Sequence, residues 1–156
     1  MRKTLADNII FKNDDFLVID KPVGVSIHNQ EESGDLITAL SSLLGAKKLF
    51  PPHRLDKATS GLQILCLNSE SAREISKLFE DRKVQKKYVG IVAGKVPQTG
   101  VWTNPISDKA EGAKNPQGPL IDRVPSETHF KCIDQSPFFS LVEFDILTGR
   151  QHQIRK

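Results

Sequence analysis

The chain of 156 residues contains little cysteine and no long apolar run, the features that mark disulfide-linked and membrane-spanning proteins. It has two cysteines, one methionine, one tryptophan and one tyrosine. It also lacks the run of about 18 uncharged apolar residues that a membrane-spanning helix requires. Cys66 and Cys132 lie far apart in apolar stretches, which favours buried free thiols over a disulfide. The apolar run near the N-terminus, 9–11, is too short for a signal peptide, which needs about 7–15 apolar residues. We therefore expect a cytoplasmic protein with no membrane partner.

The overall composition is that of an ordinary globular protein. Lys and Arg number 22 against 19 Asp and Glu, so the formal net charge is +3, and 38% of the residues are hydrophobic. These values exclude a collagen-like, coiled-coil or wholly disordered chain, and the length fits one domain. A small positive charge permits nucleic-acid binding without requiring it, because the clustering of basic residues decides the electrostatic footprint. We expect a single domain over 1–156 that acts as a monomer.

Apolar patterns and turn residues in the first half predict an α+β fold. Short strands are predicted over 8–11 and 16–19, with turn residues between them. Asp35 and Gly45 are placed to begin and end a helix. A nearly continuous apolar run over 62–67 predicts a strand that is buried on both faces. The mixture of hairpins and helices favours a mixed, largely antiparallel sheet with flanking helices over a regular alternation of strands and helices.

The next part of the chain predicts an amphipathic helix, followed by a segment rich in proline. Ser71 and Glu74 form a possible capping box for this helix, which is predicted to end near Arg82. Residues 97–125 hold five of the nine prolines, which predicts a long loop or a partly ordered insertion. The final stretch, 148–155, is predicted to begin a helix. Strands are predicted over 86–93, 127–133 and 138–147, the last two as a hairpin.

Reactive or phosphate-binding side chains gather in three segments that contain turn residues: 53–61, 86–88 and 148–155. The first is a loop that leads into a buried strand, and loops held by a rigid sheet often carry catalytic groups. Asp56 in this loop lies between two basic residues, which favour the ionised carboxylate. The residues alone leave two interpretations open: a catalytic carboxylate, or a structural turn residue that pairs with an arginine.

Two other chemistries fit the first segment poorly. Ser60 lacks the glycines of a nucleophile elbow, since alanine and leucine stand at the two required positions. Zinc binding through His53, Asp56 and His152 matches no usual ligand spacing. We therefore expect neither a serine hydrolase nor a metal site.

The other two segments also admit two interpretations each. Tyr88, the only tyrosine, either packs in a half-buried strand or offers a stacking surface or a proton acceptor beside a nucleotide base. The lysines before it form either a solvated face or a phosphate track. Arg150 and Arg155 are five residues apart and would not share a helix face. One of them could then meet a buried carboxylate while the other meets phosphate.

Four segments of the chain, taken in order, share their motifs with one enzyme family. Residues 16–28 read FLVIDKPVGVSIH, residues 53–61 read HRLDKATSG, residues 87–89 read KYV and residues 148–155 read TGRQHQIR. They resemble, respectively, the Lys-Pro-x-Gly opening, the catalytic-aspartate signature, the active-site tyrosine segment and the closing motif of the pseudouridine synthase family, in its RluA branch. The resemblance extends from about residue 8 to 155, and the order of the four motifs makes it specific.

The resemblance implies the fold of that family and an isomerase that converts a uridine of rRNA or tRNA to pseudouridine without a cofactor, after flipping the base out of the RNA. Asp56 would be the catalytic carboxylate, which either attacks C1′ or removes the C2′ proton. Tyr88 would stack on the uracil and act as a base at C5, and Arg155 would pair with Asp56. The residues implied to contact RNA are His53, Arg54, Thr59, Lys86, Lys87, Arg150 and His152.

The catalytic domain of that family normally continues beyond the segment that matches 148–155, whereas this chain ends one residue later. We therefore expect an incomplete catalytic domain. One alternative is a non-catalytic RNA-binding relative or remnant of such an enzyme. Another is an aspartate-based glycosidase or nucleosidase, which usually requires a second positioned carboxylate. Asp134, Glu143 and Asp145 do not lie in motif-like loops, which disfavours this second alternative.

Overall fold

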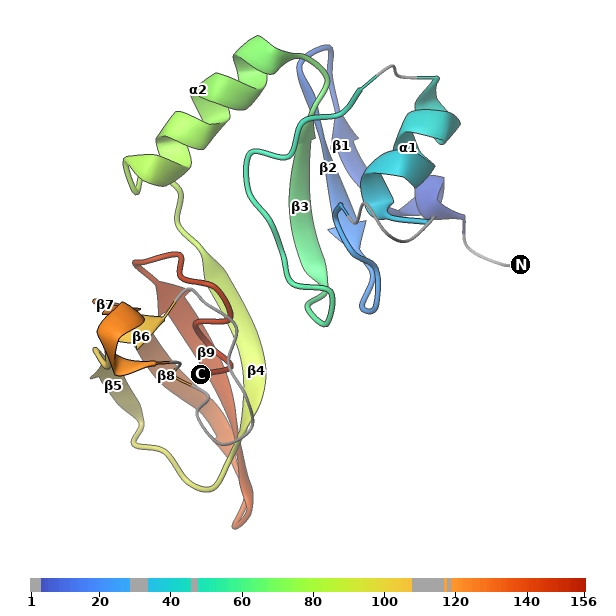
Figure 1. Ribbon diagram of the computed structural model, residues 1–156. Coiled ribbons are helices and arrows are strands. Elements are labelled where there is room, and N and C mark those ends of the chain that lie inside the picture. The colour runs from blue at the N-terminus through green and yellow to red at the C-terminus, as the bar shows by residue number, and fades with distance from the viewer. Residues whose placement is uncertain (1–3, 29–33, 46–47, 108–116, 118) are drawn as a thin grey trace. The chain divides into compact units, whose positions relative to one another are not determined.

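The computed structural model describes residues 4–28, 34–45, 48–107, 117 and 119–156. The chain divides into two compact units, Met1–Lys83 and Val84–Lys156 (Figure 1). Each unit is built on an antiparallel sheet, and all the strand pairs in the described residues are antiparallel. The α+β class and the predominance of antiparallel pairing agree with the prediction from the sequence.

The first unit is a three-stranded sheet, ordered β1-β2-β3, with two helices. Leu17 and Ile19 of β2 lie on the same face as Leu65 of β3, because alternate residues of a strand point to the same side. This face packs against Leu36 and Leu40 of α1, and all five side chains are fully buried. The elements are η1 (Leu5–Asn8), β1 (Ile9–Lys12), β2 (Phe16–Lys21), α1 (Leu36–Leu44), β3 (Gly61–Cys66) and α2 (Ser69–Glu80).

The two helices differ in how well their ends follow the sequence prediction. For α1 the prediction is confirmed: the Asp35 side chain accepts a hydrogen bond from the Thr38 N–H, and Gly45 ends the helix at φ 62°. For α2 the capping box at Ser71 is wrong. Asn68 is the N-cap, and its side-chain oxygen accepts a 2.8 Å hydrogen bond from the Ser71 N–H. An asparagine three residues upstream satisfies this donor, so the helix begins before the predicted box.

The strand predicted over 62–67 forms as β3, but it is not buried on both faces. Leu62 is 62% exposed, whereas Gln63, the one polar residue of the run, is fully buried. The prediction is wrong because the face that carries Gln63 and Leu65 packs against α1, whereas the opposite face leaves Leu62 exposed. An apolar run of strand length does not show whether one or both faces of the sheet are covered. None of the helices in the described part of the chain has the length and apolar character needed to cross a membrane.

Both cysteines are free and buried, as predicted. The burial of Cys66 makes the stability of the folded chain depend on pH in the alkaline range. Burial raises the pKa of the Cys66 thiol above 9.0, and the charge of Asp15 raises it further. Between its unfolded and folded pKa values the folded state therefore keeps a proton that the unfolded chain has lost. The stabilising contribution is fully present below pH 9.0 and is lost as the pH rises through the folded-state pKa.

We predict that Cys66→Ala flattens the decline of stability above this pH. The maximum slope that one titrating group contributes is about 1.4 kcal/mol per pH unit, and the variant lacks this contribution. Urea unfolding on both sides of the thiol pKa measures it. Leu65→Ala is the control, because it removes an equally buried side chain of the same strand that does not ionise. An equal alkaline decline in Cys66→Ala and wild type would contradict the assignment.

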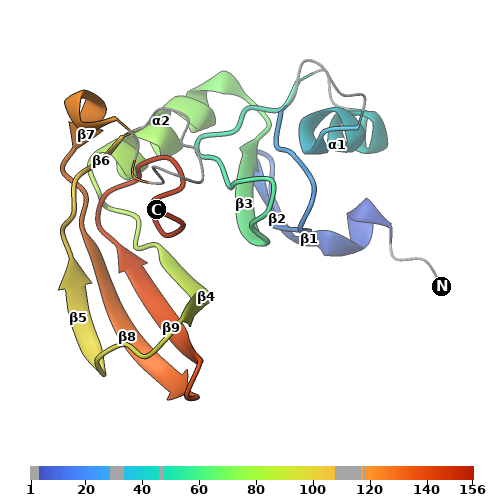
Figure 2. The same ribbon diagram turned by 60° about the horizontal axis from the view of Figure 1, so that its bottom comes forward.

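The second unit is a four-stranded antiparallel sheet with the order β4-β9-β8-β5. Figure 2 shows these four strands side by side in this order. The hairpin predicted around Ser136 is confirmed, since β8 and β9 pair along their length. A separate pair of short strands, β6 and β7, completes the unit. The elements are β4 (Lys87–Ala93), β5 (Thr99–Trp102), β6 (Ile106–Ser107), η2 (Leu120–Asp122), β7 (Arg123–Val124), β8 (Thr128–Gln135) and β9 (Phe139–Ile146).

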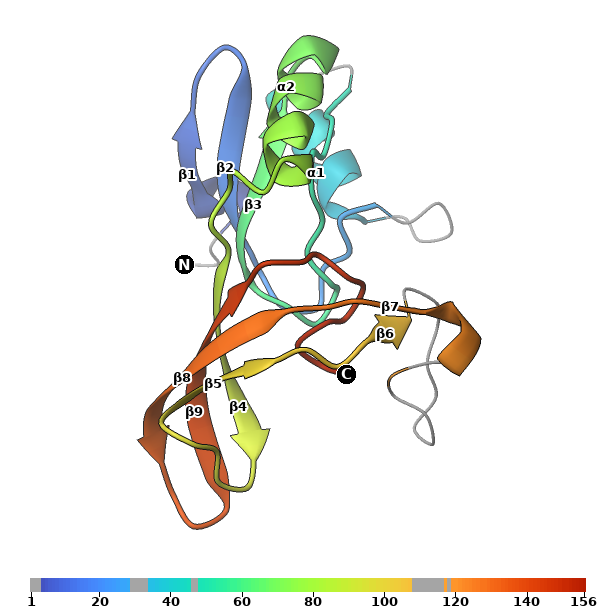
Figure 3. The same ribbon diagram turned by 90° about the vertical axis from the view of Figure 1, so that its left-hand side faces the viewer.

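The segment 97–125 is not a loop throughout. It contains β5, β6, η2 and β7, while residues 108–116 and 118 lie outside the described part. In Figure 3, β6, η2 and β7 lie at the end of this unit that is opposite the turn of the β8–β9 hairpin. Trp102 stacks on Phe130 with ring centroids 4.4 Å apart, which joins β5 to the core formed with Val142 and Phe144. Gly100 admits this ring, because a Cβ there would lie 2.5 Å from Phe130.

Candidate active site

The opening motif and the aspartate motif meet in the first unit. The carbonyl oxygen of Lys57, the residue after Asp56, accepts a 2.8 Å hydrogen bond from the Gly24 N–H. It also lies 3.4 Å from the Nζ atom of Lys21. Gly24 has a φ of 84°, a conformation that favours glycine and that this turn requires. The backbone that carries Asp56 is therefore tied to the turn after β2, although more than thirty residues separate them in sequence.

Lys21 is the functional candidate that the sequence prediction missed. Its side chain is fully buried, and the ammonium donates to the carbonyl oxygens of Pro22 at 3.0 Å and Val25 at 2.9 Å. Burial lowers the pKa of Lys21, and the negative charge of Asp56 partly offsets this effect. A buried lysine whose charge interacts with that of Asp56 is a candidate functional residue. The available signal was a lysine that ends an apolar strand directly before a proline.

The side chains near Asp56 lie at different depths. Asp56 and Thr59 are half-buried, and Arg54 is exposed. The Thr59 N–H donates a 3.0 Å hydrogen bond to the Asp56 carbonyl, which forms a tight turn after the aspartate. The ring of His53 stacks on Phe79 of α2 with centroids 4.6 Å apart. The roles of Asp56 in catalysis and of the other three motif residues in RNA contact stay predictions.

The tyrosine motif and the closing motif meet in the second unit. Lys86, directly before the tyrosine motif, places its Nζ atom 3.4 Å from the Thr148 carbonyl oxygen, and a Cβ on Gly149 would lie 3.6 Å from the same atom. Tyr88 is half-buried on β4 and packs against the aromatic core beside Phe144, its partner in β9. Lys87 alternates to the other face, where its ammonium lies 3.2 Å from a carboxylate oxygen of Glu143. Asp56 belongs to the first unit, so the contact predicted between Asp56 and Arg155 stays a prediction.

The closing motif forms successive turns rather than the predicted start of a helix. His152 has a φ of 54°, in the left-handed region, which interrupts a right-handed helical path. Its carbonyl accepts hydrogen bonds from the N–H groups of Arg155 at 2.8 Å and Lys156 at 3.1 Å. Arg155 is exposed, and Arg150 is half-buried with its Nε donating to the Pro125 carbonyl at 3.2 Å.

Gln153 holds these turns against β8. Its Oε1 atom accepts from the Thr148 hydroxyl at 2.8 Å and from the Arg150 N–H at 3.0 Å. Its Nε2 atom donates to the Glu127 carbonyl at 3.0 Å and to the Thr128 hydroxyl at 2.9 Å. One amide therefore satisfies four partners from two segments. Side-chain hydrogen bonds replace the helical bonds expected from the sequence, which explains why no helix forms.

We predict that Gln153→Leu lowers the free energy of unfolding by about 2 kcal/mol, because it leaves half-buried donors and acceptors without their partner. Urea unfolding of the full chain measures this loss. The matched control is Gln85→Leu, because Gln85 is exposed and its amide donates an exposed hydrogen bond to Asp145 at 3.3 Å. This control is expected to change stability by less than about 0.5 kcal/mol. Equal unfolding midpoints for the two variants would show that the network does not stabilise the segment.

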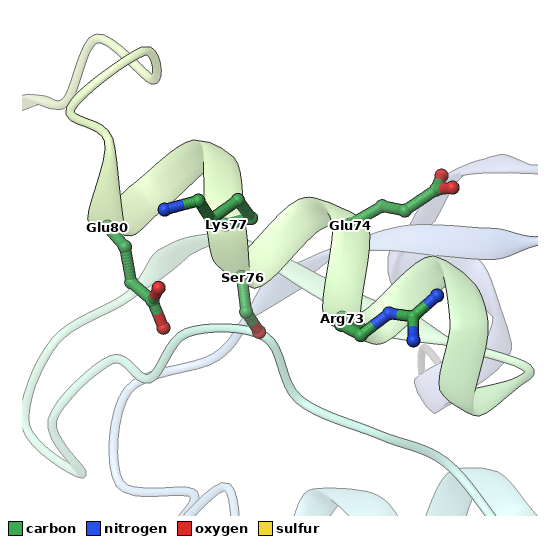
Figure 4. Close-up of a pocket in the computed structure, with 5 residues that line it drawn as sticks. All are labelled: Arg73, Glu74, Ser76, Lys77 and Glu80. Atoms are coloured by element: carbon green, nitrogen blue, oxygen red, sulfur yellow. The ribbon is translucent and has the colours of Figure 1, made fainter.

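A surface depression of about 370 Å³ runs along α2 and does not involve the motif residues. The residues that line it are Arg73, Glu74, Ser76, Lys77 and Glu80. Their side chains do not converge on one point (Figure 4). Lys77 instead forms a 2.8 Å ion pair with Asp81, one turn along the helix. The mixed charges are typical of a solvated helix face. Among the described residues, no three His, Cys, Asp or Glu side chains are grouped to hold a metal ion.

A comparison with known families identifies the family of this chain. A family model described as RNA pseudouridylate synthase matches residues 15–156, which is most of the chain. The chain belongs to this family. The family predicted from the four motifs is therefore confirmed, and its members named below are isomerases.

Several curated members of the family are similar to this chain. An uncharacterized RNA pseudouridine synthase of Haemophilus influenzae is 33% identical over 152 residues, covering 94% of this chain and 65% of that protein. The tRNA pseudouridine synthase C of Haemophilus ducreyi is 31% identical, with 96% and 67% covered. The ribosomal large subunit pseudouridine synthase C of Vibrio vulnificus is 34% identical, with 97% and 48% covered. The chain thus spans about half to two thirds of the length of these relatives.

A solved structure supports the fold of the family. Human RNA pseudouridylate synthase domain containing 4 superposes with a TM-score of 0.79 at 28% identity, and the match covers 97% of this chain and 63% of that one. The α+β pseudouridine synthase fold predicted from the sequence is confirmed.

Proposed function

We propose that this chain carries the catalytic machinery of an RNA pseudouridine synthase, with Asp56 as the catalytic carboxylate. The observation that carries the proposal is the pairwise meeting of the four family motifs. In the first unit the opening motif holds the backbone next to Asp56. In the second unit Tyr88 and Ile154 of the closing motif pack against the same core, and Lys86, directly before the tyrosine motif, meets Thr148. Motifs distant in sequence that meet in space are typical of an assembled active site.

The proposed reaction exchanges one bond for another at the same sugar carbon. The N1–C1′ bond of a uridine breaks, the uracil turns, and a C5–C1′ bond forms, while C5 loses its proton to solvent and N1 gains one. The reaction is redox-neutral and requires no cofactor. Positive charge develops at the sugar during cleavage, and the Asp56 carboxylate stabilises or captures it, as carboxylates do in glycoside chemistry. The target uridine first leaves the folded RNA and enters the site.

The other motif residues take supporting roles in this proposal. Tyr88 stacks on the uracil and serves as a base at C5, and Arg155 pairs with Asp56 to orient it. Arg54, which is exposed, occupies the space of the flipped base or binds an adjacent phosphate. The remaining residues proposed to contact RNA are His53, Thr59, Lys86, Lys87, Arg150 and His152.

We propose rRNA or tRNA as the substrate class. Two relatives carry names that specify these classes, one a tRNA and one a ribosomal large subunit pseudouridine synthase. Recognition of folded RNA depends on shape and on contacts spread over the surface rather than on one motif. A monomeric state and a cytoplasmic location are the accompanying predictions.

Release of tritium from RNA labelled at uridine C5 tests the proposal, because formation of the C5–C1′ bond expels the C5 hydrogen. We expect the wild-type chain to release label from transcripts of rRNA or tRNA, and nuclease digests to contain pseudouridine. RNA binding that weakens with salt but releases no label would instead support a non-catalytic RNA-binding relative. Release of free uracil without pseudouridine would support a glycosidase.

A further inference from the structure

The aspartate loop rests on one buried amide that belongs to none of the four family motifs. We propose that Gln63 of β3 is a positioning residue that fixes the backbone of the loop 53–57 and thereby aims Asp56. This inference rests on the proposed function, because it assigns Gln63 a part in the reaction of Asp56. Gln63 lies in the middle of β3 and is fully buried.

The Gln63 side chain bonds to the loop on both of its functional atoms. Its Oε1 atom accepts a 3.2 Å hydrogen bond from the Leu55 N–H, and its Nε2 atom donates a 2.7 Å hydrogen bond to the His53 carbonyl. The second Nε2 hydrogen goes to the Ile64 carbonyl at 2.8 Å. The opposite amide orientation would place donor against donor and acceptor against acceptor, so the bonding pattern defines it. The amide thus serves the loop as a neighbouring strand would.

His53 provides a second bond between the same two segments, in the opposite direction. Its ring Nε2 atom accepts a 3.0 Å hydrogen bond from the Ile64 N–H of β3. On this side of β3 Phe50 bridges Cys66, and the Ile64 N–H, two residues earlier, takes its partner from the loop instead of from a strand. Gln63 and His53 therefore brace the loop against β3 in both directions, directly before Asp56.

Asp56 lies between two anchored peptide groups. On its N-terminal side Gln63 holds the Leu55 N–H, and on its C-terminal side the Gly24 N–H holds the Lys57 carbonyl. A catalytic carboxylate is effective when the backbone that carries it is fixed before the substrate arrives. Burying a primary amide in an apolar strand costs free energy unless its hydrogen bonds are made. The Gln63 amide avoids this cost because the loop and the Ile64 carbonyl supply its hydrogen-bond partners.

Gln63→Met tests the proposal with a side chain of similar size that makes none of these bonds. We expect turnover at saturating RNA, per folded molecule, to fall about 100-fold, while RNA affinity changes by less than about threefold. Amide hydrogen exchange at Leu55 is expected to lose protection about tenfold or more. The matched control is Leu65→Val, which weakens the core of the same strand without touching the loop. It should lower stability and leave turnover per folded molecule and Leu55 protection unchanged.

Gln63→Glu adds a readout that a purely structural role would not move. The ionised carboxylate still accepts from the Leu55 N–H, but it offers no donor to the His53 carbonyl. Protonation restores one donor, and burial raises the pKa of a carboxyl at this position. We therefore expect the activity of Gln63→Glu relative to wild type to increase as the pH falls from about 8 to about 6, with no such change for Gln63→Met.

The outcomes separate this inference from the proposed function. Full turnover by Gln63→Met, corrected for the folded fraction, would overturn the positioning role. So would Leu55 protection that is the same in Gln63→Met and wild type. If the wild-type chain releases no label, the proposed function fails, and with it the catalytic part of this inference. Leu55 exchange then still decides whether Gln63 anchors the loop.

Discussion

Asp56→Asn is expected to abolish release of tritium from RNA labelled at uridine C5, with a fall in rate of about 10⁴-fold or more. The amide is nearly the same size as the carboxylate but carries no negative charge, so it neither stabilises nor captures the sugar cation. Asp56→Glu keeps the charge and moves it by one methylene, and it too should lose most of the activity because the site requires close alignment. RNA binding by both variants should stay within about threefold of wild type.

The matched control for Asp56 is another aspartate of the same unit. Asp14 is exposed in the turn between β1 and β2, so Asp14→Asn makes the same chemical change away from the motifs. It should release label at the wild-type rate. Normal activity of Asp56→Asn would exclude the proposed mechanism. Equal losses in Asp14→Asn and Asp56→Asn would point to a general effect of charge on RNA binding.

Lys21→Met is expected to lower the free energy of unfolding by about 3 kcal/mol and to reduce label release by at least about tenfold. The ammonium donates to the carbonyl groups of Pro22 and Val25 and lies within reach of that of Lys57. Methionine fills the space and leaves these buried acceptors without their donor. It also removes the positive charge that interacts with Asp56. Urea unfolding and label release on the same samples separate the loss of fold from the loss of activity.

Lys12→Met is the control for this variant, because Lys12 is exposed on β1 and its replacement should change stability by less than about 0.5 kcal/mol. The pH dependence gives a second check. Burial lowers the pKa of Lys21 below 10.5, so above the folded-state pKa the unfolded chain binds more protons than the folded protein. Lys21 therefore makes stability rise with pH within that window, and Lys21→Met lacks this rise. A variant with unchanged stability at every pH would contradict the assigned role.

The predictions that depended on local chemistry held where one residue decides the structure. Asp35 and Gly45 delimit α1 because a side-chain cap and a left-handed glycine act within one turn. The capping box at Ser71 did not form because the Ser71 N–H donates to the Asn68 side chain, which caps the helix three residues earlier. The closing motif does not form the predicted helix because the Gln153 side chain donates to Glu127 and Thr128, at the start of β8 and distant in sequence.

The sequence by itself determined the family, the helices α1 and α2, the strands outside 97–125 and the residues on which the function is proposed. Each of the four motifs is a short contiguous segment, so it can be identified without knowledge of the fold. Only the tertiary structure decided what holds Asp56 in place. The sequence around Lys21 and Gln63 does not show which groups they contact. The structure shows that both are fully buried and contact the loop around Asp56 through hydrogen bonds. Burial and bonding partners depend on which distant segments meet, and the physical cost of a buried polar group becomes visible only there.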